Sequence, residues 1–332
     1  MKAFLARNWF VASLPLVIAL AWAFPSAASK GGWLRPEVTT DVGVALIFLL
    51  QGMALPTAAL ATGASRWRLH ALVQSFTFVV FPLMGIALDA AAGRALPPDL
   101  RLGFLFLCVL PSTVSSSVVL TQLAGGNTVG AIFNAAMSNV IGVFVTPLWV
   151  AWLARAGGGH AEMGGVLQKV FLLLLAPLAA CQALRWRLKD WVEPRKKALG
   201  NLSGALILYL VFAAFCESVT QRVWSGMGPG VTAGAALGVL LVFVLAMLGT
   251  HALARLLRLD RPDWTAAMFC APQKTIASGI PLAKAIFGAH PGLGLILLPV
   301  LLYHPLQLVV CGGLAARWSR SPDGKRQATS IR

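Results

Sequence analysis

The residues best suited to chemistry gather in one stretch of an otherwise apolar chain, CAPQKTIASGIPLAKAIF at 270–287. It places Gln273, Lys274, Thr275 and Ser278 close together, with a proline before and after them. An amine at the centre of a bilayer costs about 2.5–3.5 kcal/mol, and each proline removes a backbone donor where no water can replace it. The stretch therefore predicts an interrupted helix that lines a polar cavity inside the protein.

A second polar stretch, PSTVSSS, also begins with a proline. The hydroxyls of Ser115, Ser116 and Ser117, together with carbonyls freed by an unwound segment, could bind an ion or a small solute. The alternative is that these serines donate to carbonyls of their own helix. Asn134 and Ser138, four positions apart in the next span, share a helix face and either line the same site or join neighbouring helices.

The composition is that of an integral membrane protein. Of 332 residues, 58% are hydrophobic and 11% are charged, whereas soluble domains carry about 25% charged residues. The net charge of +16 would suggest nucleic acid as the partner of a soluble chain, but the long apolar runs leave little soluble surface here. The basic residues are therefore interpreted as topology signals in a lipid bilayer, and no nucleic-acid partner is expected.

The five cysteines fall in apolar spans, with no CxxC pair and no histidine at ligand spacing. We interpret them as small buried side chains and predict neither a disulfide nor a metal site. No P-loop, GxSxG or HExxH motif occurs, which argues against an ATP-driven pump and against an enzyme. No cofactor is expected beyond Na⁺ or H⁺ as a coupling ion.

Ten apolar spans approach the length of about 20 residues that a bilayer requires. They lie at about 9–28, 42–62, 70–91, 102–123, 128–154, 164–184, 201–221, 232–254, 265–288 and 291–316. With a cytoplasmic N-terminus, most lysines and arginines fall in cytoplasmic segments. The positive-inside rule then predicts both termini in the cytoplasm, and we expect a bacterial inner membrane.

The two halves of the chain repeat one pattern. Pro111 and Pro272 open the polar stretches of the fourth and ninth spans, 161 positions apart, and Pro147 and Pro305 in the following spans lie 158 apart. Five spans per half is an odd number, so the second half enters the membrane from the opposite side. The pattern predicts one membrane domain over 1–332, made of inverted repeats at about 9–154 and 164–316 and a cytoplasmic tail at 317–332.

The motifs PSTVSSSVVLTQLAGGNTVGAIFNAAMSN, VTPLWV, FCAPQKTIASGIPLAK and LLYHPLQL resemble the bile acid:sodium symporter superfamily. More narrowly, they resemble its SBF-like branch, which includes the solute carrier family 10 member 7 proteins. The resemblance implies an all-α membrane protein with ten transmembrane helices in two inverted five-helix repeats. It also implies a panel domain, a core domain, and discontinuous helices 4 and 9 that cross.

In sodium-coupled members of this superfamily, two Na⁺ ions lie behind the crossing, and a glutamate of the ninth helix is one of their ligands. The resemblance places Ser115, Ser116 and Ser117 at the fourth-helix ligand positions, and Asn134 and Ser138 near those of the fifth. This chain departs in the ninth helix, which carries Gln273 and Lys274 and no carboxylate.

A fixed ammonium on Lys274 could take the place of a sodium ion and repel Na⁺ from the site. The chain is accordingly expected to be a secondary active transporter that moves a small organic, anionic solute by alternating access. Coupling would be independent of Na⁺, or linked to protons if the buried amine exchanges its proton. Glu217 and His304 are candidate ionisable partners of the site.

Three rival functions stay open. The first is a non-transporting membrane regulator with a transporter fold, which a closed crossing with Lys274 paired to protein oxygens would favour. The second is a membrane-embedded enzyme, which would need a nucleophile and a base in one cavity. The third is a channel, which the lack of a regular polar stripe disfavours. The sequence makes no prediction of oligomeric state.

Overall fold

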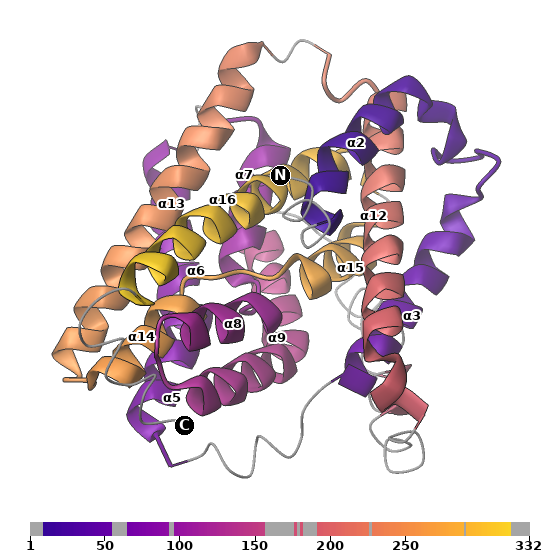
Figure 1. The fold of residues 1–332 in the computed structure, drawn as a ribbon. Coiled ribbons are helices and arrows are strands. Elements are labelled where there is room, and N and C mark those ends of the chain that lie inside the picture. Colours follow the sequence, from indigo (N-terminus) through magenta and orange to yellow (C-terminus); the bar gives the residue numbers. More distant parts are fainter. Residues whose placement is uncertain are drawn as a thin grey trace.

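Every regular element in the part of the chain that the computed structural model describes is a helix. The described residues are 9–54, 65–92, 96–156, 176–177, 180–181, 191–225, 228–288 and 290–319. The α-helices (Figure 1) are α2 Trp9–Ala23, α3 Pro36–Ala54, α5 Trp67–Ser75, α6 Phe81–Ala92, α7 Pro98–Val109, α8 Ser115–Leu123, α9 Thr128–Ala156, α12 Lys196–Thr220, α13 Pro229–Leu256, α14 Arg261–Cys270, α15 Ile276–Phe287 and α16 Leu293–Ser319. Shorter helical segments are η1 Pro25–Ala27, the π-helical turn η2 Phe76–Val80, and η5 Glu193–Arg195.

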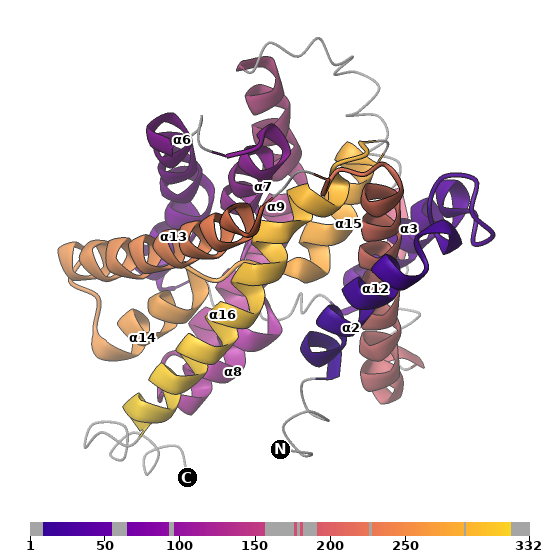
Figure 2. The same ribbon diagram turned by 90° about the horizontal axis from the view of Figure 1, so that it is seen from above.

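The helices form two groups that lie side by side in both views (Figure 1, Figure 2). The smaller group consists of α2, α3 and α12, and α12 packs against both of the others. The larger group contains α5 to α9, α13, α14 and α16. Helix α15 lies between the groups, because it contacts α3 and α12 on one side and α16 on the other.

Several helices have the length and apolar character of membrane spans. Within the described residues, five such helices occur: Trp67–Ala91, Thr128–Trp152, Lys197–Thr220, Gly230–Leu256 and Leu293–Ser319. Shorter apolar helices lie at Ala12–Ala23 and Ile276–Phe287. The predicted sixth span, 164–184, falls almost entirely outside the described residues.

The predicted fourth and ninth spans are both interrupted, as the sequence indicated. Helix α7 ends at Val109 and α8 begins at Ser115, while α14 ends at Cys270 and α15 begins at Ile276. Figure 1 shows the extended segment that joins α14 to α15.

Proline accounts for the first of these interruptions. Pro111 has no N–H to donate to the carbonyl four residues earlier. It also disfavours a helical conformation for the residue before it, and Leu110 is indeed extended, with φ −69° and ψ 151°. Pro272 lies at the equivalent point after α14, and the chain is again extended at Thr275, with φ −91° and ψ 133°.

Ion pairs and loop contacts gather at two ends of the bundle. At one end Arg66, just before α5, pairs with Asp260, just before α14, at 3.2 Å. At the other end Arg101 of α7 pairs with Asp89 of α6 through two contacts of 2.8 Å. Helices α5 and α6 therefore carry the chain from the first end to the second.

Further contacts join loops at the second end. His290, before α16, lies 3.7 Å from Asp99, and the backbone N–H of Lys30 donates to Glu217 at 2.7 Å. Ser218 of α12 donates to the carbonyl of Pro291 at 2.8 Å and accepts from the N–H of Gly294 at 2.9 Å. These last two bonds tie the smaller helix group to the larger one.

Helix α9 lies so close to the first interruption that one of its residues has no room for a side chain. A Cβ added to Gly142 would lie 2.6 and 2.7 Å from two ring carbons of Pro111. We predict that Gly142→Ala lowers the free energy of unfolding by about 1–3 kcal/mol, because overpacking a well-packed core costs this much. Thermal unfolding of the purified protein in detergent measures the change.

Gly313→Ala is the matched control, since no atom lies within 4 Å of a Cβ at Gly313 in α16. This substitution should leave the melting temperature unchanged or raise it slightly, because alanine is the better helix former. Equal effects of the two substitutions would contradict the close contact between α9 and Pro111.

Candidate functional site

The two interruptions are hydrogen-bonded to each other. The backbone N–H of Thr275 donates to the carbonyl of Pro111 at 3.1 Å, and the hydroxyl of Ser112 donates to the carbonyl of Cys270 at 2.5 Å. The N–H of Thr275 and the carbonyls of Pro111 and Cys270 are groups that an unbroken helix would have paired internally. The fourth and ninth predicted spans therefore meet at their unwound segments, deep in the protein.

A small network of side chains joins the same two segments. The amide oxygen of Gln273 accepts from Thr113 at 2.9 Å and from Ser116 at 2.8 Å, and the two hydroxyls lie 2.7 Å apart. Among the described residues, the amide nitrogen of Gln273 has no hydrogen-bond partner although the side chain is fully buried.

Lys274 is the one buried lysine of the crossing, with 1% of its surface exposed. Its ammonium donates to the carbonyls of Leu110 at 2.7 Å, Cys108 at 3.0 Å and Thr77 at 3.3 Å. It also lies 3.9 Å from the centre of the Phe81 ring, where a cation is attracted to the π face. An ammonium has three N–H donors, and all three have a carbonyl here. We call these three carbonyls the carbonyl cage.

Local sequence explains why Thr77 offers a free carbonyl. Thr77 lies in the π-helical turn η2, in which the N–H of Phe81 is paired with the carbonyl of Phe76. The next residue, Pro82, has no N–H to donate. The carbonyl of Phe78 is freed in the same way, and the indole of Trp149 donates to it at 2.9 Å.

The other two cage carbonyls lie at the end of α7, where the last carbonyls of a helix have no intrahelical partner. The positive charge of Lys274 is favourable there, because the C-terminus of a helix carries a partial negative charge. The equivalent carbonyls after α14 are paired differently. Ser112 donates to Cys270, and the Tyr303 hydroxyl donates to Pro272 at 2.6 Å.

Each interruption is held by the second helix after it in the chain. Helix α9 serves the first: the N–H of Ser112 donates to Ser138 at 2.9 Å, Asn139 donates to the carbonyl of Ser112 at 3.1 Å, and Thr146 donates to that of Val109 at 2.7 Å. The predicted residue Ser138 thus binds backbone.

Helix α16 serves the second interruption. Gln307 accepts from the N–H of Lys274 and donates to its carbonyl, both at 2.8 Å. Its amide nitrogen also lies 2.9 Å from the ring nitrogen Nδ1 of His304. His304 therefore reaches the site through Gln307.

The remaining predicted residues differ in their hydrogen-bond partners. Ser117 donates to the carbonyl of Thr113 at 2.6 Å, so it follows the alternative of bonding within its own helix. Asn134 accepts from Gln74 at 3.2 Å. Thr275 caps α15 through the N–H of Ala277.

Ser115 opens α8 and is exposed, whereas Ser278 is buried with its hydroxyl 3.4 Å from the amide oxygen of Asn139. Glu217, a candidate ionisable partner of the site, forms its hydrogen bonds at the second end of the bundle. It lies near the end of α12, where its carboxylate accepts from Lys30 and from Gln221.

Sequence reasoning missed Thr77, Tyr303 and Gln307. Tyr303 and Gln307 lie one helical turn apart in an apolar span, on either side of Pro305. Both are fully buried. Two such hydrogen-bonding side chains on one helix face were the available signal for a polar contact there. Thr77 contributes its backbone, so its side chain carried no signal.

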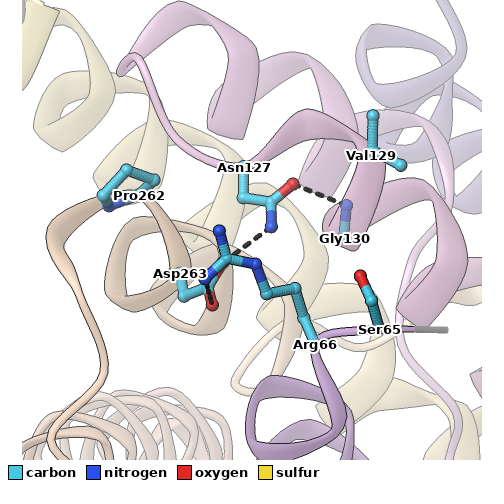
Figure 3. A pocket seen from close by; sticks show the side chains of 7 residues that line it. All are labelled: Ser65, Arg66, Asn127, Val129, Gly130, Pro262 and Asp263. Atoms are coloured by element: carbon cyan, nitrogen blue, oxygen red, sulfur yellow. Dashed lines mark hydrogen bonds and ion pairs between the residues drawn. The ribbon is translucent and has the colours of Figure 1, made fainter. Parts of the chain in front are cut away.

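A separate polar pocket of about 340 Å³ lies at the first end of the bundle (Figure 3). The lining residues are Ser65, Arg66, Asn127, Val129, Gly130, Pro262 and Asp263. Asn127 donates to Asp263 at 2.6 Å and accepts from the N–H of Gly130 at 2.8 Å, while Arg66 lies 3.5 Å from Asp263. The side chains that line the pocket thus link the starts of α5, α9 and α14 through hydrogen bonds and an ion pair.

Comparison with protein-family models assigns the chain to one transporter family. The model of the SBF-like CPA transporter family matches residues 8–320. "Uncharacterized protein PA2026" of Pseudomonas aeruginosa is 39% identical over 320 residues, which cover 96% of this chain and 95% of that protein.

Two further relatives carry functional names. "Putative symporter YfeH" of Escherichia coli is 32% identical, with 97% of this chain and 96% of that one covered. "Sodium/bile acid cotransporter 7" of Xenopus tropicalis is 31% identical, with 92% and 90% covered.

The carbonyl cage yields a stability prediction. Lys274→Met keeps much of the side-chain volume but leaves three buried carbonyls without a donor, and each unsatisfied group costs about 1–3 kcal/mol. We expect the free energy of unfolding to fall by about 3 kcal/mol or more, measured as a lower melting temperature in detergent.

Lys284→Met is the control, because Lys284 is only partly buried and donates to the carbonyl of Gly288 at 2.9 Å. Its loss should cost about 1 kcal/mol or less. The cage would be refuted as a stabilising contact if both variants melted at the same temperature as the unmodified protein.

Proposed function

The chain belongs to the SBF-like CPA transporter family, and we propose that it is a secondary active transporter that moves a small organic solute by alternating access. It is an integral, multi-pass membrane protein of a transporter family. The names "symporter" and "sodium/bile acid cotransporter" belong to relatives and support the proposal for this chain. The solute would bind where the two interrupted helices meet.

One observation carries this proposal: two helices are interrupted at the point where they contact each other. Two hydrogen bonds join the unwound segments, one between backbone groups and one from the hydroxyl of Ser112. Irregular backbone is tolerated at membrane depth where protein buries it or where it lines a cavity. Transporters place substrate sites at such discontinuous helices. The predicted residues Ser116, Gln273, Lys274 and Thr275 all lie at this crossing.

The proposed architecture is ten helices in two inverted five-helix repeats, with a panel and a core. Its support is the equivalent role of α9 and α16, each of which holds the interruption that precedes it. The polar contacts at each end of the bundle also join residues that are predicted to lie on the same side of the membrane. Arg66 and Asp260, both assigned to the cytoplasmic side, pair at one end, and the outer residues Lys30 and Glu217 meet at the other. Helices α2, α3 and α12 would form the panel, and both termini would be cytoplasmic, in a bacterial inner membrane.

We propose an anionic solute on the basis of two helix N-termini. Helices α8 and α15 both begin at the crossing, at Ser115 and Ile276, and neither has an acidic residue in its first turn. The N-terminus of a helix attracts negative charge and presents free N–H groups. The α8 terminus has no side-chain cap. The sequence also suggested Lys274 as an anion partner, but its ammonium is turned to the carbonyl cage.

Lys274 instead supports a proposal about coupling. Its ammonium satisfies backbone oxygens as a bound cation would, so the chain carries its own positive charge where sodium-coupled relatives would bind an ion. A second cation nearby would be repelled. Transport is therefore proposed to be independent of Na⁺, with proton coupling through the amine as the alternative.

A second candidate function is a non-transporting membrane regulator that keeps this fold. The specific observation in its favour is that Lys274 is buried and paired with protein oxygens, which is the arrangement of a closed crossing. A transporter passes through a closed state during its cycle, so measured uptake separates the two functions.

The test has two steps. Purified protein in detergent is first screened for a rise in melting temperature with organic anions, beginning with bile acids and simple carboxylates, because a ligand of the folded state raises it. Uptake of the best labelled ligand into proteoliposomes is then measured with imposed Na⁺ and pH gradients, for the unmodified protein and Lys274→Ala.

We predict uptake that does not change with the Na⁺ gradient, and a loss of at least tenfold in Lys274→Ala at equal amounts of folded protein. Lys284→Ala, in the helix α15 that follows, is the control and should retain uptake. Ligand binding without uptake under any gradient would favour the regulator. Uptake driven by the Na⁺ gradient would refute the proposed role of Lys274.

A further inference from the structure

We propose that Gln307 is the positioning residue that keeps the ammonium of Lys274 in the carbonyl cage. Gln307 thereby decides whether the cage is filled by the chain's own amine or is open to a small cation from solution. This inference rests on the proposed role of Lys274 as an internal cation.

The first step of the argument is the backbone contact. Gln307 bonds to both polar backbone atoms of Lys274 at 2.8 Å, accepting from the N–H and donating to the carbonyl. In an antiparallel β-ladder, a residue of the neighbouring strand forms the same pair of bonds with the N–H and the carbonyl of the residue opposite. The pair of bonds fixes the position and orientation of the backbone from which the lysine side chain starts.

The second step is that the rest of this segment gives Lys274 little other backbone support. It lies between α14 and α15, where the chain makes no helical hydrogen bonds, and its neighbour Thr275 bonds across to Pro111. Gln307 itself is fully buried, so water does not compete for its amide. Loss of the amide would leave a buried N–H and a buried carbonyl unpaired.

The third step concerns which end of the amide faces which atom. The backbone of Lys274 fixes this orientation, because its N–H needs an acceptor and its carbonyl needs a donor. The oxygen Oε1 of Gln307 therefore faces the N–H, and the nitrogen Nε2 faces the carbonyl. Gln307 Nε2 also lies 2.9 Å from Nδ1 of His304, so His304 packs against the end of the amide that donates.

The fourth step is that the cage and Gln307 belong to different helices. The cage carbonyls come from η2 and from the end of α7, whereas Gln307 belongs to α16. Lys274 therefore spans the distance between them, held at its backbone by α16 and at its ammonium by the cage. Release of the backbone lets the extended segment move, and the ammonium withdraws from the carbonyls.

The experiment measures melting temperature in detergent with ammonium chloride or, at equal concentration, choline chloride. Choline is too large for the cage, so it controls for ionic strength. The variants are Lys274→Ala, Gln307→Leu, Gln307→Glu and the double variant Lys274→Ala/Gln307→Leu. Gln307→Glu keeps an acceptor for the N–H of Lys274, and its ionised carboxylate cannot donate to the carbonyl; it serves where Gln307→Leu does not fold.

We expect ammonium to raise the melting temperature of Lys274→Ala by about 2 °C or more relative to choline, because it refills the cage. Gln307→Leu and Gln307→Glu should show the same response, while the unmodified protein shows none. The double variant should melt below Lys274→Ala, because the backbone N–H and carbonyl at position 274 still lose their partner. The drop should be smaller than the one that Gln307→Leu causes in the unmodified protein, since the contacts of the ammonium can be lost only once.

Tyr303→Phe is the matched control. It removes a bond from α16 to the same interruption, to the carbonyl of Pro272, without touching the backbone of Lys274. It should lower the melting temperature with no ammonium response. Gln307 would then differ from a residue that only stabilises the fold.

The outcomes distinguish the positioning role of Gln307 from the role of Lys274 as an internal cation. Ammonium rescue of Lys274→Ala without rescue of either Gln307 variant would overturn the positioning role and leave the internal cation intact. Rescue of none of the variants would overturn the internal cation, and the positioning role with it. Additive effects in the double variant would likewise contradict the inference.

Discussion

The site depends on one electrostatic arrangement, a single ammonium surrounded by backbone carbonyls in the protein interior. Unwound helix segments expose carbonyls that nothing in lipid can satisfy, and a buried amine needs acceptors for all of its N–H groups. Lys274 meets both requirements at once through Thr77, Cys108 and Leu110. The interruption after α7 and the buried lysine therefore stabilise each other.

The need to pair exposed backbone carbonyls also explains why polar side chains gather on α9 and α16. Every carbonyl from Cys108 to Thr113 has a partner: Lys274 for two of them, and the residues Thr146, Thr275, Asn139 and Ser117 for the others. Many of the polar side chains in these spans therefore form hydrogen bonds with backbone groups. A polar residue near a transporter crossing is therefore weak evidence of solute contact until its partners are known.

Much of the fold could be predicted from the sequence, because prolines act locally. Pro111 and Pro272 mark both interruptions, and the apolar spans mark most of the helices. The site was harder to predict, since its partners depend on tertiary contacts. Lys274 could be identified by its cost in the membrane, but the choice of Leu110 and Thr77 as acceptors depends on how three helices pack. The contacts of Glu217 with Lys30 and Gln221 could not be predicted either, because a charge in an apolar span gives no sign of which loop covers it.

An ammonium that is part of the chain cannot be left behind on either side of the membrane. A carrier that binds a free ion changes its charge between the loaded and the empty journey, whereas a carrier with a built-in cation keeps that contribution constant. Each elementary charge moved across 100 mV is worth about 2.3 kcal/mol. If Lys274 stays protonated and no other ion is bound, the loaded and empty forms differ only by the charge of the solute. The membrane voltage would then act on the cargo alone.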